Sequence, residues 1–253
     1  ALKIKVFEGY IANVAPTGMS EAEANAQFVA ILEERPANLH TFERALLLLA
    51  DRYGTRITAS QLVPDPQDPA RYTFRIAVHQ SQFSFRFFAD NRGTDAHGRD
   101  QAYGWAAWNA VFGNDRLAAA IFTVPSSPDE LLYGEVNYAA AWFAGNLWTE
   151  VGASFSQTED GEMPSTIGVS SEAQRFYLRG SVPLLRARNQ SLWLNALFDV
   201  RETEEDDPVG PDTDEHMRVL RIGAIYTVLD SGGRNDFIVE ISHGLDVFGA
   251  SGN

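Results

Sequence analysis

Cysteine is absent from the sequence of 253 residues. Its absence excludes disulfide scaffolds, zinc sites with cysteine ligands and cysteine nucleophiles. Basic residues are also scarce, with 20 lysine and arginine residues against 34 aspartate and glutamate residues and a formal net charge of -14 at pH 7. Because a nucleic-acid-binding surface needs positive charge to meet the phosphates, we expect no nucleic-acid partner.

Long hydrophobic runs are missing as well. A membrane-spanning helix needs about 20 consecutive apolar residues, whereas apolar stretches here, such as Ala45–Ala50, are far shorter. This excludes an α-helical membrane protein but not a membrane β-barrel, whose strands alternate apolar and polar residues. At the N-terminus, Leu2, Ile4 and Val6 alternate with lysines and show no signal-peptide pattern. We therefore expect a strand already under way and a chain that begins inside a longer protein.

Catalytic and metal-binding patterns are absent too. The five histidines are scattered, and the sequence has no HExxH, GxSxG or phosphate-loop pattern. We therefore expect no catalytic residue, no metal site and no cofactor. The acidic run at 202–216 is interpreted as a solvated surface loop, with cation binding as the alternative.

Residues 1–79 mix strand and helix patterns. Ser20 followed by Glu23 matches a capping box at the start of a helix, and Pro36 lies beyond that helix's end. The predicted elements are, in order, strand 2–14, helix 21–34, a helix capped by Thr41 and ended by Gly54, strand 55–63 and strand 72–78. The pattern predicts a small α+β module of the order β-α-α-β-β.

Residues 80–253 show about nine strand-like runs and no convincing amphipathic helix. The runs are about 10–13 residues long, closer to the 9–11 of a tilted membrane strand than to the 5–6 of an average soluble strand. Short and long connections alternate: the short ones are 113–115, 144–146, 186–190 and 230–235, and the long ones are 91–100, 125–130, 158–171 and 202–216. This rhythm is typical of an antiparallel membrane barrel with tight periplasmic turns.

Charged side chains occupy the strand register opposite the apolar series. These are Arg86, Glu135, Glu150, Arg175, Arg179, Asp199, Arg221 and Glu240. If the apolar face meets lipid, these residues line the pore. The outer face of a soluble sheet would place the same residues in water, and the residues alone leave that alternative open.

Four segments carry a family resemblance. They are LKIKVFEGYIANV at 2–14, TFERALLLLADRYG at 41–54, FFADNRGTDAHGRDQAYGWAAWNAVFGNDRLAAA at 87–120 and ISHGLDVFGAS at 241–251. In order, they resemble a junction between two POTRA domains, a POTRA helix, a first barrel hairpin with the turn beyond it, and a mid-barrel strand. The family is that of two-partner secretion outer-membrane transporters, the haemolysin secretion/activation family.

The resemblance implies two POTRA domains followed by a sixteen-stranded barrel. On this basis, residues 1–79 are a POTRA domain with the junction from a preceding one, and residues 80–253 are the N-terminal part of a transmembrane β-barrel. An odd number of strands does not close a single-chain bacterial barrel, so the chain would hold only part of it. The family's lumen-loop motif, an Arg-Gly pair followed by an aromatic residue, has no counterpart here, so its role is not carried over.

The function that the resemblance implies is export of a large unfolded exoprotein from the periplasm to the cell surface. The expected location is the bacterial outer membrane, with the POTRA module in the periplasm, and the expected partners are the exoprotein client and outer-membrane lipid. We expect the client to add a strand to an exposed edge formed by Thr55, Arg56, Ile57, Thr58 and Ser60. Two alternatives remain: a barrel assembly factor of the same superfamily, and a soluble α+β binding protein.

Overall fold

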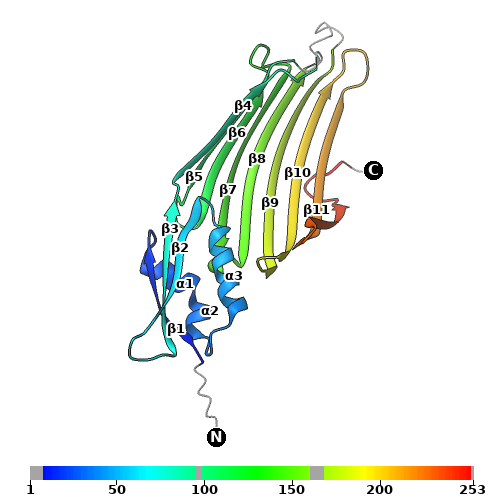
Figure 1. Cartoon of the computed structure of the whole chain (residues 1–253). Coiled ribbons are helices and arrows are strands. Elements are labelled where there is room, and N and C mark those ends of the chain that lie inside the picture. The colour runs from blue at the N-terminus through cyan, green and yellow to red at the C-terminus, as the bar shows by residue number, and fades with distance from the viewer. Residues whose placement is uncertain (1–7, 95–97, 160–167, 252–253) are drawn as a thin grey trace.

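The computed structural model describes residues 8–94, 98–159 and 168–251. It contains a three-stranded sheet of order β1-β3-β2 and a nine-stranded sheet in which the strands follow chain order from β4 to β12. Figure 1 shows the large sheet as a tall curved wall, with the small sheet and the helices at its lower end. Among the described residues, no helix is both long and apolar enough to cross a membrane.

From residue 8 onward, where the structure describes it, the N-terminal module has three strands and three helices. They are β1 (Tyr10–Thr17), α1 (Glu21–Gln27), α2 (Val29–Glu33), α3 (Leu39–Ala50), β2 (Thr55–Pro64) and β3 (Arg71–Gln80). The central strand β3 pairs in parallel with β1 and antiparallel with β2. Strand β2 therefore lies at an edge of the small sheet, as the sequence predicts.

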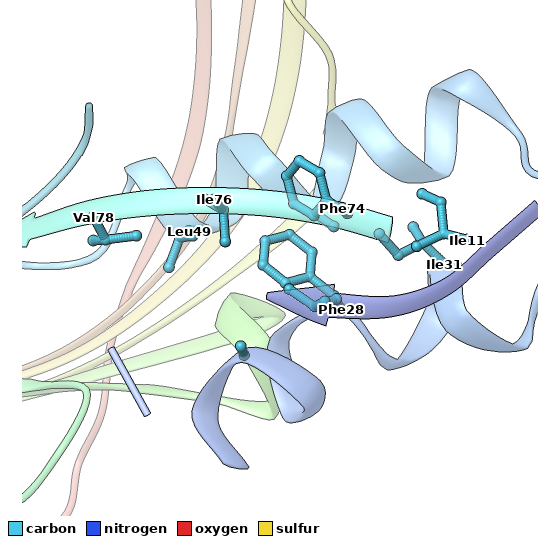
Figure 2. Close-up of a cluster of buried hydrophobic side chains, with 10 residues drawn as sticks. Ile11, Phe28, Ile31, Leu49, Phe74, Ile76 and Val78 are labelled. Carbon is cyan, nitrogen blue, oxygen red and sulfur yellow. The ribbon is translucent and has the colours of Figure 1, made fainter. Parts of the chain in front are cut away.

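The first predicted helix is interrupted. The helix expected over 21–34 divides into α1 and α2 at Phe28, where the backbone leaves the helical region at φ -108° and ψ 15°. Phe28 is fully buried, and its ring meets that of Phe74 edge-on with 5.2 Å between centroids. The break lets Phe28 and Ile31 enter the same core (Figure 2).

The predicted caps of the next helix are wrong at both ends. Asn38 caps α3, because its Oδ1 accepts the backbone N–H of His40 at 2.9 Å. Thr41 lies inside the helix, where its hydroxyl donates to Glu34 Oε1. At the other end Asp51 is the capping residue, and Gly54, at φ 66°, turns the chain into β2 instead.

The capping box of α1 is present as predicted. Glu23 N–H donates to the Ser20 hydroxyl oxygen, and Ser20 N–H donates to Glu23 Oε2. These contacts with the Ser20 side chain and backbone hold the pKa of the Glu23 carboxyl below its usual value. Because a cap satisfies N–H groups that the helix leaves unpaired, it stabilises the start of α1.

The described residues of the second part of the chain fold into nine antiparallel strands. They are β4 (Phe83–Asp90), β5 (Gln101–Asn109), β6 (Asp115–Thr123), β7 (Leu131–Trp142), β8 (Leu147–Glu159), β9 (Ser170–Arg186), β10 (Gln190–Asp206), β11 (Thr213–Asp230) and β12 (Gly233–Gly244). Each strand pairs with the next along the chain. The connections alternate between long and short as predicted.

Two predictions about this sheet need correction. Strands β9, β10 and β11 have 17, 17 and 18 residues, which exceeds the expected length. The acidic run at 202–216 is largely strand, and only 207–212 form the loop between β10 and β11. Extended backbone pairing leaves these carboxylates solvated on the sheet surface, and Glu202 gains an ion pair with Arg218 at 2.9 Å.

One face of the large sheet is apolar and exposed. The register places on this face a continuous series of large hydrophobic side chains that are at least about one-third exposed. The series includes Phe83, Phe85, Phe87, Val136, Val151, Phe176, Leu178, Ile222, Val239 and Ile241. An apolar surface that extends over nine strands is far larger than the patches that soluble monomers expose.

Candidate functional site: the polar inner face and its junction with the module

The opposite, inner face of the large sheet carries the charged side chains. Antiparallel register makes a straight row across six strands, running from Arg86 of β4 through Glu135 of β7 to Arg175 of β9. A second row contains Glu150 of β8 and Arg179 of β9, which lie directly opposite each other. All eight charged residues predicted on the polar register therefore share one face.

Tyr177 of β9 links the two rows. Its hydroxyl lies 2.8 Å from Glu135 Oε1 and 2.7 Å from Glu150 Oε1. The single hydroxyl hydrogen can be donated to only one carboxylate at a time. The guanidinium carbons of Arg175 and Arg179 lie 4.9 and 5.7 Å from the centre of the Tyr177 ring. The tyrosine thus holds two carboxylates and two guanidinium groups around one aromatic ring.

Asp199 of β10 organises the other half of the network. Arg175 donates to both of its oxygens, at 2.8 and 2.9 Å, and Arg221 donates to Oδ2 at 2.8 Å. Arg221 also lies 3.8 Å from Glu240 of β12. The Asp199 side chain is only 6% exposed, so two arginines compensate a carboxylate that would be costly to bury alone.

The polar network therefore contains seven of the eight predicted residues. We use this name for Glu135, Glu150, Arg175, Tyr177, Arg179, Asp199, Arg221 and Glu240. Arg86 shares their face but, in the described part of the chain, forms no hydrogen bond or ion pair with them. Sequence reasoning missed Tyr177, although its position between Arg175 and Arg179 on the same register could have revealed it.

Aromatic side chains gather where the inner face meets the module. Tyr53, just after α3, packs edge-on against Trp148 of β8 with 5.3 Å between centroids, and Trp148 contacts Trp193 of β10 at 6.2 Å. Arg116 of β6 lies over the Tyr53 ring at 4.3 Å. A cavity of about 560 Å³ opens beside this cluster, and Glu150, Arg179, Arg221 and Glu240 also line it.

Helix α3 is fastened to the short turns at the lower edge of the sheet. Arg186, at the end of β9, forms a bidentate ion pair with Asp51, with N–O distances of 2.7 and 2.8 Å. Arg188 in the next turn lies 3.2 Å from Glu43. Arg44 donates to the Pro183 carbonyl at 2.7 Å and to Asn146 Oδ1 at 2.8 Å. The helix thereby closes part of the lower end of the inner face (Figure 1).

The predicted client-binding residues all lie on the edge strand β2. Thr55, Arg56, Ile57, Thr58 and Ser60 pair on one side with β3, and the sheet order places no described strand on the other side. A β-bulge occurs between Ile57 and Ala59, so Thr58 has no partner residue and its hydroxyl donates to the Ala77 carbonyl at 3.1 Å. The strand is mostly exposed, which leaves an edge available for pairing.

Within residues 8–94, 98–159 and 168–251, no group of three or more histidine and carboxylate side chains is placed to hold a metal ion. The clustered ionisable groups of the inner face form arginine–carboxylate pairs across neighbouring strands. Such pairing keeps the face polar and fixes the side chains relative to one another.

Comparisons with solved structures define the fold. The chain superposes on CdiB from Escherichia coli with a TM-score of 0.80 and 14% identity, covering 98% of this chain and 47% of that one. For CdiB from Acinetobacter baumannii the values are 0.64, 11%, 94% and 46%. For BamA from Haemophilus ducreyi lacking POTRA domains 1–3 they are 0.57, 8%, 94% and 49%. No family model and no curated protein matches.

These similarities establish a class of architecture. The chain has the fold of an α+β module of POTRA type followed by part of an antiparallel β-barrel, as in the CdiB and BamA structures. This confirms, at the level of fold, the resemblance to two-partner secretion transporters that the sequence indicates. The chain spans about half the length of the solved chains that it matches.

Proposed function

We propose that this chain is part of an outer-membrane translocator that exports a large unfolded exoprotein from the periplasm to the cell surface. Residues 1–79 would form the periplasmic module that captures the client, and residues 80–253 part of the barrel through which it passes. The observation that carries this proposal is the two-faced sheet. One face is apolar and exposed, the other holds the polar network, and a module with a free strand edge is fastened below.

Lipid is the partner that best fits the outer face. Contact with acyl chains would remove exposed side chains such as Phe176 and Ile222 from water, which is energetically favourable for apolar surface. In lipid, the backbone groups at the free edges of β4 and β12 would need partner strands, because unpaired groups are costly there. The remaining barrel strands would supply them. The sheet's surface and its fold both support the proposed outer-membrane location.

The inner face suits passage of an unfolded polypeptide. The eight charged residues predicted for this face are balanced, with four arginines at 86, 175, 179 and 221 against four carboxylates at 135, 150, 199 and 240. Most of these charges are already paired with each other. A wall that is polar but locally neutral would attract neither acidic nor basic segments strongly, so segments of varied sequence could slide past it.

Capture would use the edge of β2. Main-chain pairing binds an extended segment with little demand on its sequence, which suits an unfolded client. A substitution of Thr58 by proline removes a backbone donor from this edge, and the bulge makes proline tolerable there. Because β3 is central, Ile76→Pro should unfold the module and serves as the contrasting variant.

The test measures surface exoprotein in cells that carry each variant, with circular dichroism of the purified protein as the folding control. Thr58→Pro should reduce export strongly with the fold retained, whereas Thr58→Ser should export normally. A folded Thr58→Pro protein that exports at the normal level would rule out capture at this edge.

Assembly of other barrels is a second candidate, because the BamA structure shares this fold. Deletion of the gene separates the two: an assembly factor is needed for many outer-membrane barrels, and an exporter for one exoprotein. The soluble alternative predicts a protein that stays in solution without detergent. The exposed apolar face argues against it.

A further inference from the structure

A crevice of about 800 Å³ lies between the module and the outer side of the barrel's lower edge. Helices α1, α2 and α3 form one wall, and the turns at 110–114 and 143–146 form the other. Phe112 and Phe143, at the tips of these turns, are 86% and 78% exposed. Aromatic side chains exposed at such a position are typical of the boundary between a membrane and water.

A buried arginine lines this crevice, and within the described residues it forms no direct ion pair. Arg52 is only 5% exposed. Its Nη1 donates to Asn114 Oδ1 at 2.6 Å and its Nη2 to Gln27 Oε1, both neutral amides, and its Nε has no partner among the described residues. A guanidinium is costly to bury without a paired anion. Burial lowers the pKa of Arg52, and the nearby carboxylate of Glu23 offsets only part of this effect. A ligand with a negative group would offset that cost.

Carboxylates lie in the same crevice. Glu23 lines it from α1, with Oε2 held by Ser20. Asp115 lines it from β6 and accepts from the Tyr138 hydroxyl at 2.7 Å. The crevice therefore offers charge of both signs, and a ligand that carries one negative and one positive group complements it better than a simple anion does.

The crevice is also continuous with the apolar outer face. Tyr138, Ala140 and Trp142 of β7 belong to the outward register of that strand, and all three line the crevice. Acyl chains lying along β7 would thus lead directly to the charged wall. Phe112 and Phe143 would stand on either side of them.

We propose that this crevice binds a phospholipid with an ethanolamine headgroup, from the leaflet that faces the periplasm. The phosphate would face Arg52, the ammonium would face Glu23 or Asp115, and the acyl chains would follow the outward side of β7. This inference rests on the proposed membrane location. It gives the module a lipid contact in addition to its protein contacts through α3.

The test is native mass spectrometry of the full-length protein extracted from outer membranes in mild detergent. The wild type should retain ethanolamine phospholipid. Arg52→Gln keeps a hydrogen-bonding side chain but removes the charge, and should lower retention by about tenfold, the loss expected for one charge-assisted bond. Ala30→Trp fills the crevice from its exposed side and should abolish retention. Arg188→Gln, outside the crevice, is the matched control and should retain lipid normally.

Addition of lipids tests the headgroup. Ethanolamine phospholipid should restore binding to delipidated wild type, whereas choline and glycerol phospholipids should bind at least about tenfold more weakly because they lack a hydrogen-bonding ammonium group. Equal retention by the wild type and Ala30→Trp, or equal binding of the three lipids, would overturn the proposal. Membrane fractionation and export are measured on the same strains. A wild type that fractionates with the membrane and exports but holds no lipid contradicts only this inference, while a wild type absent from the membrane contradicts the proposed function.

Discussion

The two parts of the molecule bury opposite kinds of side chain. In the N-terminal module, Phe28, Leu49 and Phe74 are fully buried between helices and sheet (Figure 2). In the large sheet, Phe85 and Phe176 point outward and are 85% and 57% exposed, while the charged Asp199 is buried on the inner face. The module thus has the apolar core of a protein in water, whereas the exposed apolar face of the sheet is the surface that the proposed contact with lipid requires.

The largest expected difference between the two parts concerns their phenylalanines. Phe74→Ala opens a cavity in the module's core and should cost about 3–5 kcal/mol of stability. Phe176→Ala on the outer face leaves no enclosed cavity and should cost well under half as much. Chemical denaturation of the detergent-solubilised protein, followed by circular dichroism, measures both. Equal losses would mean that the outer face is packed against protein.

A charge placed on each face of one strand sharpens the comparison. Ile222→Arg puts a cation on the outer face and should cost about 2–4 kcal/mol if the residue lies near the membrane midplane. Ile225→Arg is the matched control, because Ile225 lies on the inner register of the same strand and lines the inner cavity. Folding into vesicles should be impaired only by the first variant. A larger defect for Ile225→Arg would reverse the assignment of faces.

Removal of the central carboxylate tests the polar network. Asp199→Asn leaves Arg175 and Arg221 without the anion that both contact, and should cost about 1–3 kcal/mol. Asp236→Asn provides a comparison on the exposed β12, where the ion pair with Arg234 is open to water and should contribute little. Thermal unfolding in detergent, in low and high salt, distinguishes them. Similar melting temperatures for both variants would show that the network does not stabilise the sheet.

The smallest expected effect concerns the first helix of the module. Ser20→Ala removes the cap of α1 and should cost about 1 kcal/mol. Because Ser20 lowers the folded-state pKa of Glu23, the box stabilises the module above the ordinary carboxyl pKa and loses this effect as the pH falls through the lowered value. Stability measured from pH 6 to pH 3 should therefore fall less steeply in Ser20→Ala. If stability falls equally steeply with pH in the wild type and in Ser20→Ala, the cap does not lower the pKa of Glu23.

Local patterns in the sequence were sufficient for much of the fold. Strict alternation around Arg175 and Asp199 determined which side chains share a face, and Ser20 with Glu23 marked the start of α1. Weaker local signals misled: Asn38 and Thr41 can both cap a helix, and Phe28 fits a continuous helical stripe until tertiary packing against Phe74 breaks it. Propensity alone does not decide such cases.

Contacts between distant segments lay beyond the reach of the sequence. The ion pair of Arg186 with Asp51 joins residues separated by 135 positions, and the packing of Tyr53 on Trp148 joins the module to β8. No sequence periodicity connects such residues, because α3 comes close to the short turns of the large sheet only in the folded chain. The buried Arg52 was invisible for the same reason. Its hydrogen-bond partners Asn114 and Gln27 come from different parts of the chain, and only folding brings them around it.

The most direct test of the account is the accessibility of the two ends of the sheet in intact cells. Because the chain contains no cysteine, single cysteines can be introduced without background. Asp212→Cys lies in the loop between β10 and β11, and Asn189→Cys lies in the opposite turn between β9 and β10. A membrane-impermeant thiol reagent should label the first in whole cells and the second only after the outer membrane is opened. Equally fast labelling of both in intact cells would contradict a barrel that spans the outer membrane with its module in the periplasm.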